Sequence, residues 1–363
     1  MSRRPITDPE QIRGALEEGR IRRVLAVRAS RLGDLLMATP ALHAFHERNP
    51  AAEITFLTNE YSRAFLENDP DIHELLTFKG RERDLLTRKA APIRKQVQER
   101  KVDLLLALRP RKEIGAFAEK LEIPYVYPLG QRGTDSDDVH VVQQTWDRIA
   151  PLGLSGEPGP MRLFLAEEDL RSARQVIPDG EGPIILLHPG GDDTKRLWLW
   201  RGVRKRIWPK THWAELIQRL EGGLGARVLV SSGNALEGRW VEDILGRVPN
   251  RATHLSGLPL RQFCAAFELS DLVITGDTGP LHIASALGRP QLCLFGPTAV
   301  TYTGPWNDKA RVLRKEIPCS PCQGKKTRCR QNVCMEELSP SQVHGEARRY
   351  LEELASRAEA LSS

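Results

Sequence analysis

The sequence lacks any apolar run near the roughly 20 residues that a helix needs to span a bilayer. It also lacks a secretory signal, because its opening stretch, MSRRPITDPEQIRGALEEGR, is charged and contains no apolar h-region. We therefore expect a cytoplasmic protein.

Signs of nucleic-acid binding are missing as well. The 53 basic and 47 acidic residues give a net charge of +6, but they form no familiar nucleic-acid motif. A moderate positive excess fits an anionic substrate or an anionic membrane surface equally well. We expect partners of those kinds and no nucleic acid.

Two catalytic signatures are absent, namely a GxxxxGK[ST] phosphate loop and a defensible Ser-His-Asp order. Two Asp-x-Asp triplets, Asp69-Pro70-Asp71 and Asp135-Ser136-Asp137, offer carboxylates for a divalent metal that would hold a diphosphate. Both triplets lie in polar, loop-like sequence, and we interpret them as solvated loops.

Cysteine is scarce except in one place. Of six cysteines, four lie close together as Cys319, Cys322, Cys329 and Cys334. In a cytosolic chain this clustering favours metal over disulfides, and four thiolates suit zinc or iron. A site with four protein ligands has no open position, so the metal would be structural. The alternative is four reduced thiols in a loop.

Strand and helix patterns alternate along the whole chain, which predicts an α/β fold with parallel, doubly wound sheets. Residues 84–99 are predicted as one helix, and residues 341–360 as the last helix. The length favours two domains, and LGLSGEPGPM is the best linker between them. We expect domains at 1–160 and 161–340, followed by a terminal helix over 341–363. Two Rossmann-like halves would bind ligand in a cleft at the carboxyl ends of their strands.

The clearest local pattern is the stretch Leu272–Pro297, which predicts a strand, a polar turn, a helix and a second strand. In its turn, Gly276 and Gly279 free the backbone and Thr278 offers a hydroxyl at a helix amino terminus, where phosphate is favoured. Asp277 fits a helix cap or a loop brace. His282 is either a phosphate donor or a helix-packing residue.

Two other loops follow predicted strands of the second half. His188-Pro189-Gly190-Gly191 offers backbone donors, and the basic, tryptophan-rich stretch Lys195–Lys210 could place a cation on a diphosphate. The alternative for this stretch is a solvated surface loop. Glu237, at the next helix start, is placed to accept hydrogen bonds from a ribose.

In the first half, the loop Ser30–Asp34 follows the first predicted strand. Asp34 either complements the helix dipole or acts as a general base for an acceptor hydroxyl, and spacing alone favours the first role.

These motifs, taken together, resemble glycosyltransferase family 9, the heptosyltransferases of lipopolysaccharide core assembly. The similar segments follow the family order from about residue 24 to about residue 345. They are AVRASRLGDLLMATPAL (Ala26–Leu42), HPGG (His188–Gly191), KRIWPKTHWAEL (Lys205–Leu216), SGNALE (Ser232–Glu237), GDTGPLHIASALGRPQLCLFGPT (Gly276–Thr298) and CSPC (Cys319–Cys322).

The resemblance implies a GT-B fold with two Rossmann-like domains that face a central cleft. It also implies inverting transfer of heptose from an ADP-sugar to a lipid A-Kdo type acceptor, without a catalytic metal. Asp34 then becomes the general base. The residues implied for the donor pocket are Gly190, Gly191, Glu237 (at the ribose), Asp277, Thr278, Gly279 and His282.

The family's cation precedes Trp-Pro, and Arg206 occupies that place here, where the pattern expects lysine. Arg206, Lys205 and Lys195 therefore all remain candidates for the phosphate contact. The basic residues Arg81, Arg83, Arg88, Lys89, Arg94 and Lys95 either contact the inner membrane or an acidic glycolipid, or form a solvated helix face. Rival hypotheses are a relative that uses another nucleotide sugar or a protein acceptor, and a non-catalytic protein that binds nucleotide sugars.

Overall fold

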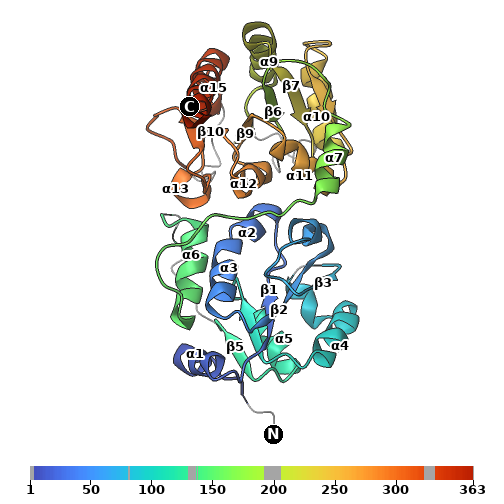
Figure 1. The fold of residues 1–363 in the computed structure, drawn as a ribbon, viewed down its shortest axis with the longest axis vertical. Helices are drawn as coiled ribbons and strands as arrows, with labels where there is room; N and C mark the ends of the chain where they lie inside the picture. Colours follow the sequence, from blue (N-terminus) through green and yellow to red (C-terminus); the bar gives the residue numbers. More distant parts are fainter. Residues whose placement is uncertain are drawn as a thin grey trace. The chain divides into compact units, whose positions relative to one another are not determined.

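The computed structural model describes residues 4–80, 82–129, 136, 138–191, 206–322 and 332–362. The chain divides into two compact units, Met1–Phe164 and Leu165–Ser363. Each unit is built around its own sheet with helices packed against it (Figure 1).

The first unit has a five-stranded parallel sheet in the order β3-β2-β1-β4-β5. Its strands are β1 (Arg23–Val27), β2 (Glu53–Asn59), β3 (Glu74–Phe78), β4 (Leu104–Ala107) and β5 (Tyr125–Tyr127). Its α-helices are α1 (Pro9–Glu17), α2 (Leu32–Leu36), α3 (Thr39–Arg48), α4 (Ala91–Glu99), α5 (Lys112–Lys120) and α6 (Val141–Ile149). Short 3₁₀ turns are η1 (Glu60–Phe65), η2 (Glu82–Leu86), η3 (Arg88–Ala90) and η4 (Ala150–Leu152).

The second unit has a six-stranded parallel sheet in the order β11-β10-β9-β6-β7-β8. Its strands are β6 (Ile184–His188), β7 (Arg227–Ser231), β8 (Thr253–Leu255), β9 (Leu272–Gly276), β10 (Gln291–Phe295) and β11 (Ala310–Arg314). Its helices are α7 (Glu167–Arg174), α9 (Lys210–Leu224), α10 (Ala235–Leu245), α11 (Leu260–Glu268), α12 (Gly279–Ala286), α13 (Val300–Thr303), α14 (Val333–Glu336) and α15 (Pro340–Ser362).

Continuous apolar runs explain the central strands of both sheets. Every residue of β4, β9 and β10 is buried, as expected for parallel strands that are covered on both faces. In β10, Leu292 and Leu294 join the core that contains α9 and α15, whereas Cys293 and Phe295 point to the opposite face and pack with Leu281 of α12. Helices therefore cover both faces, and the prediction of doubly wound α/β sheets is confirmed.

The region 84–99 differs from its prediction as a single helix. The chain forms η2 and η3 first, and α4 begins only at Ala91, with Pro92 in its first turn. Proline has no N–H to donate and its ring clashes with the preceding turn, so a helix can start at Pro92 but cannot run through it.

Two other findings concern helices. Helix α7, which follows the predicted linker, was not predicted, and Arg261 of α11 binds its Asp169 through Nε at 3.1 Å. Among the described residues, no helix combines the length and the apolar composition that crossing a membrane requires.

Candidate functional site

In the first unit, the loop after β1 carries Asp34 in the first turn of α2. The preceding loop is held firmly at Ser30, whose carbonyl accepts hydrogen bonds from Asn59 Nδ2 at 3.0 Å and Ser62 Oγ at 3.2 Å. Asp34 itself keeps about a third of its side chain in solvent. A rigid loop thus presents an accessible carboxylate at the carboxyl end of a central strand.

A buried arginine lies beside this carboxylate. The Arg28 side chain is only 3% exposed, and its Nη2 lies 3.8 Å from Asp34 Oδ1. Its Nε donates to Ser30 Oγ at 2.9 Å. Burial lowers the pKa of Arg28, and the charges of Asp34 and Glu82 oppose that effect. Arg28 therefore places a desolvated positive charge beside both carboxylates.

Glu82 is the second carboxylate of this cluster. It is buried, its Oε1 accepts from the Ala29 N–H at 3.3 Å, and Arg111 Nε lies 3.8 Å from its Oε2. Burial raises the pKa of Glu82, against the influence of Arg28. Neither Arg28 nor Glu82 was predicted as a site residue from the sequence. A charged residue directly after the apolar run of β1 was a usable signal for Arg28, whereas nothing local distinguishes Glu82.

In the second unit, β9 leads through Asp277 into α12, and Thr278 is the N-cap of this helix. The Thr278 side chain makes no capping hydrogen bond. Its buried Oγ1 has no hydrogen-bond partner among the described residues. Buried hydroxyls are normally paired, and a helix amino terminus attracts anions, so the turn is suited to a phosphate oxygen.

Neighbouring strands bring the three predicted donor loops together. β9, β6 and β7 are adjacent in the sheet, so their carboxyl ends share one edge. A Cβ placed on Gly191 would lie 2.7 Å from Thr278 Cγ2, and one on Gly190 would lie 2.8 Å from Glu237 Cδ. The loop after β6 therefore lies against both the α12 turn and the start of α10, and it leaves no room for side chains at these glycines.

Glu237 is almost fully buried at the start of α10, with Asn234 as the N-cap. Its Oε2 accepts from the Gly233 N–H at 2.8 Å and lies 3.8 Å from His188 Nε2. The other ring nitrogen of His188 lies 3.0 Å from Ser231 Oγ, and burial lowers the pKa of the imidazole. One carboxylate oxygen of Glu237 thus braces its own turn.

Arg206, the predicted phosphate cation, is in contact with Asp277 of the α12 turn. Arg206 Nη1 lies 3.3 Å from Oδ2 of the buried Asp277. Asp277 therefore holds Arg206 next to the α12 turn. Gly279 opens α12, and His282 is buried in the same helix. Lys195 and Lys205 lie outside the described residues.

The cysteine cluster is described only in part, because Cys329 lies outside the described residues. Cys319 is exposed, Cys322 is half-buried and Cys334 is buried. The Cys322 N–H donates to the Pro297 carbonyl at 2.8 Å, and a Cβ on Gly296 would lie 3.0 Å from Cys334 Sγ. Both thiol-bearing segments thus approach the turn after β10, and the metal site stays a prediction.

The interpretation of Asp69-Pro70-Asp71 as a solvated loop is wrong. Asp69 is buried and Asp71 is partly buried, and both face His43 of α3. Loop-like composition did not reveal this burial because the contacts come from a helix far away in sequence. The second triplet, Asp135-Ser136-Asp137, has both aspartates outside the described residues.

Parallel Rossmann-like sheets with glycine-containing loops at their carboxyl ends define an α/β protein of the nucleotide-binding class. A model of glycosyltransferase family 9 (heptosyltransferase) matches residues 104–332, and the chain belongs to this family. The protein is thus a glycosyltransferase.

Individual relatives agree with the family assignment. The chain is 24% identical over 322 residues to lipooligosaccharide heptosyltransferase 2 of Campylobacter jejuni, which covers 86% of this chain and 94% of the relative. A solved glycosyl transferase family 9 structure from Veillonella parvula covers 92% of this chain and 97% of its own, with 21% identity and a TM-score of 0.76.

The solved E. coli ADP-heptose lps heptosyltransferase II covers 92% of this chain and 99% of its own, with 20% identity and a TM-score of 0.71. These similarities confirm the GT-B fold class with its two Rossmann-like domains.

Proposed function

We propose that the protein transfers a heptose from an ADP-sugar to a lipopolysaccharide-core acceptor of the lipid A-Kdo type, with inversion at the anomeric carbon. Family membership and the heptosyltransferase names of its relatives support the class of sugar and acceptor. The single observation that carries the donor assignment is the buried, unpartnered hydroxyl of Thr278 at the start of α12.

In this proposal the diphosphate lies against the α12 turn. Thr278 Oγ1, the Gly279 N–H and His282 donate to its oxygens, and Arg206 places a positive charge beside them. The close approach of Gly190 and Gly191 leaves backbone at the surface of the pocket, and Glu237 accepts from the ribose through Oε1. Their common role is to stabilise the charge that develops on the departing nucleotide diphosphate.

Asp34 is the proposed general base. It takes the proton of the acceptor hydroxyl while that oxygen attacks the anomeric carbon, and the bond from this carbon to the phosphate oxygen breaks in the same step. The negative charge leaves with the ADP, so no covalent enzyme intermediate forms. The buried guanidinium of Arg28 lies 3.8 Å from this carboxylate.

The first unit would carry the acceptor site and the second the donor site. Arg83, Arg88 and Lys89 are exposed next to η2 and η3 and are suited to an anionic glycolipid or the cytoplasmic face of the inner membrane. Arg94 differs from them, because its guanidinium donates to the Leu85 and Thr87 carbonyls at 2.8 and 2.7 Å. We therefore assign Arg94 to holding this segment together.

Donor selectivity tests the proposal. Calorimetric titration with ADP-, UDP- and GDP-linked sugars should show preferential binding of the ADP-sugar. Turnover with the tightest binder and a lipid A-Kdo acceptor should then release ADP. Preference for UDP or GDP would reject the heptose donor, and the absence of any binding would contradict the assignment of the α12 turn.

A further inference from the structure

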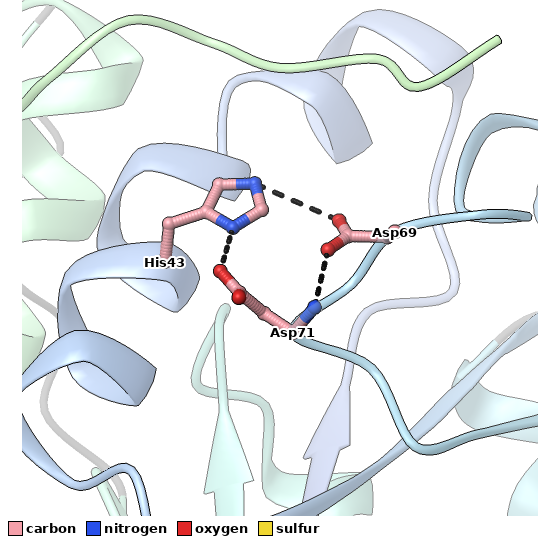
Figure 2. Close-up of side chains that lie close together, drawn as sticks. All are labelled: His43, Asp69 and Asp71. Atoms are coloured by element: carbon pink, nitrogen blue, oxygen red, sulfur yellow. Dashed lines mark hydrogen bonds and ion pairs between the residues drawn. The ribbon is translucent and has the colours of Figure 1, made fainter.

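His43, Asp69 and Asp71 form a cluster in the first unit that none of the roles above uses. His43 lies on α3, and the two aspartates lie in the segment that precedes β3. Each residue offers one potential ligand atom, and these atoms all lie within 4.8 Å of one another. Figure 2 shows the imidazole of His43 between the two carboxylates, with one ring nitrogen directed at each.

The two ring nitrogens have different surroundings. Nδ1 lies 2.6 Å from Asp71 Oδ2, which is a short hydrogen bond. Nε2 faces Asp69 Oδ2 at 3.6 Å, which is longer than a hydrogen bond. The His43 side chain is only 6% exposed, so water does not reach Nε2 freely. Nε2 nevertheless has no hydrogen-bond partner in the part of the chain that the structure describes. A buried polar atom of this kind requires an explanation.

A metal ion bound between Nε2 and Asp69 would explain why this buried nitrogen has no hydrogen-bond partner. Zinc binds imidazole nitrogen and carboxylate oxygen at about 2.0–2.2 Å, so two such ligands at a tetrahedral angle are separated by about 3.4 Å. The observed separation of 3.6 Å differs by a few tenths of an ångström. A hydrogen bond would need both atoms to approach considerably closer than this.

Asp71 has the position of an orienting carboxylate. When Asp71 accepts a hydrogen bond from Nδ1–H, the lone pair of the neutral imidazole is on Nε2, which is the usual arrangement behind a histidine that binds metal. Asp69 is also oriented, because its Oδ1 accepts from the Asp71 N–H at 3.1 Å. Asp71 is a fifth exposed, so one side of the cluster is in contact with solvent.

The electrostatics favour a cation here. With a neutral imidazole, the buried carboxylate of Asp69 and the partly buried carboxylate of Asp71 lie in one cluster, and a divalent ion would offset their charge.

We propose that this cluster binds one divalent zinc-class ion, with His43 Nε2 and Asp69 as direct ligands, Asp71 as the orienting carboxylate and water in the remaining positions. The ion would be structural, joining α3 to the segment before β3. The end of the unit lies over the same helix, since the Arg162 N–H donates to Thr39 Oγ1 at 3.2 Å and the Phe164 ring lies 6.0 Å from that of His43. The competing explanation is a metal-free ion pair with a protonated His43.

The test uses the full-length protein, stripped with a chelator and titrated with zinc alone. Because the cysteines could also bind zinc, all variants are made in a Cys319→Ser/Cys322→Ser background. That background should bind one equivalent of zinc and should gain thermal stability with it. Asp69→Asn should lose both effects, while His344→Gln, a histidine of the other unit, should keep both. Equal zinc binding with and without Asp69→Asn would overturn the proposal.

A second measurement does not depend on a variant of the cluster folding. X-ray absorption at the zinc edge of the background protein should show nitrogen and oxygen ligands at about 2.0–2.2 Å, with scattering from imidazole. Absence of bound zinc, or a shell without imidazole, would overturn the proposal and leave the ion pair as the explanation.

Discussion

At the scale of single residues, the two proposed catalytic regions differ in how their key side chains are exposed to solvent. Asp34 keeps access to solvent and lies 3.8 Å from the buried guanidinium of Arg28. Thr278 is only partly buried, but its Oγ1 atom is buried and is left without a hydrogen-bond partner in the described chain, at the expense of folding stability. An accessible base and an unsatisfied donor are both more useful to a reaction than to a stable fold.

Asp34→Asn removes the proposed base with little change in shape. General-base catalysis contributes about 10²–10⁴-fold, so we expect kcat to fall by about that factor while the Kd of the donor stays the same. Steady-state kinetics and calorimetry measure the two quantities. Glu99→Gln, at the exposed end of α4, is the control and should leave both unchanged. Unaltered turnover in Asp34→Asn would remove this residue from catalysis.

Thr278→Val removes the unpartnered hydroxyl and keeps the side-chain shape. A hydrogen bond to a charged group contributes about 1.5–3 kcal/mol, so donor affinity should fall about tenfold or more. Folding stability should stay constant or rise, because no hydrogen bond of the free protein is lost. Calorimetry and thermal melting test both outcomes.

Thr275→Val is the matched control, since Thr275 Oγ1 in β9 is likewise buried without a hydrogen-bond partner among the described residues. This variant should not affect donor binding. A loss of stability in Thr278→Val, together with unchanged affinity, would indicate a structural hydroxyl instead.

At the scale of elements, strand order decides which loops meet. β6 lies between β9 and β7, so the loop that follows it contacts both α12 and α10. His188, the last residue of β6, reaches Ser231 at the end of β7 and lies near Glu237 of α10. The same few residues therefore join neighbouring strands and shape the proposed donor pocket.

Gly190→Ala tests the close approach of these elements. The new Cβ would lie 2.8 Å from Glu237 Cδ, and overpacking of this kind typically costs about 1–3 kcal/mol. We expect lower thermal stability together with weaker donor binding, because the loop or Glu237 must move. Gly222→Ala, in α9, is the control: a Cβ there meets nothing within 4 Å, and stability should rise by about 0.5–1 kcal/mol. Unchanged donor binding in Gly190→Ala would place the loop outside the pocket.

The buried imidazole of His188 should make the unfolding free energy depend on pH. Burial lowers its pKa in the folded state, whereas the unfolded chain titrates near about 6.5. Below that pH the unfolded state takes up a proton that the folded state does not, so unfolding free energy should decrease as pH falls from about 6.5 towards the lowered pKa.

His188→Asn keeps a donor near Ser231 and should flatten this part of the pH profile of the unfolding free energy. His73→Gln, at an exposed histidine, should leave the profile as it is. Denaturant melts at several pH values provide the measurement. Parallel profiles for wild type and His188→Asn would contradict the assignment.

At the scale of the whole molecule, the modest net charge of +6 conceals a local concentration of exposed cations around η2 and η3. Each lysine or arginine near an anionic membrane surface contributes about 1 kcal/mol, and salt screens the attraction. The proposed acceptor is itself an anionic glycolipid, so this surface would serve both contacts.

Arg88→Glu/Lys89→Glu should therefore weaken binding to anionic vesicles by about 2 kcal/mol or more, which is about thirtyfold. Arg239→Glu/Arg247→Glu makes the same charge change on exposed residues of α10 and its end and should have little effect. Vesicle sedimentation at low and high salt measures both pairs. Equal binding of the two variants would show that the surface beside η3 has no special role.

The sequence by itself determined the features that depend on local pattern. Continuous apolar runs such as β9 and β10 identify buried parallel strands, and glycine and proline mark the α12 turn. Asp34 and Thr278 could be proposed as site residues because each lies at the start of a helix that follows a strand in a familiar motif. The break in residues 84–99 was missed, although Pro92 was a local signal for it.

Only the tertiary structure decided which distant residues meet. Glu82 reaches Ala29, His43 reaches Asp69 and Asp71, and Asp277 reaches Arg206. No periodic pattern in the sequence predicts these pairs, because strand order and helix packing bring the partners together. Burial, and with it the pKa direction of Glu82 and His188, follows from the same packing. Such properties belong to the folded environment of a residue, and its neighbours in sequence do not determine them.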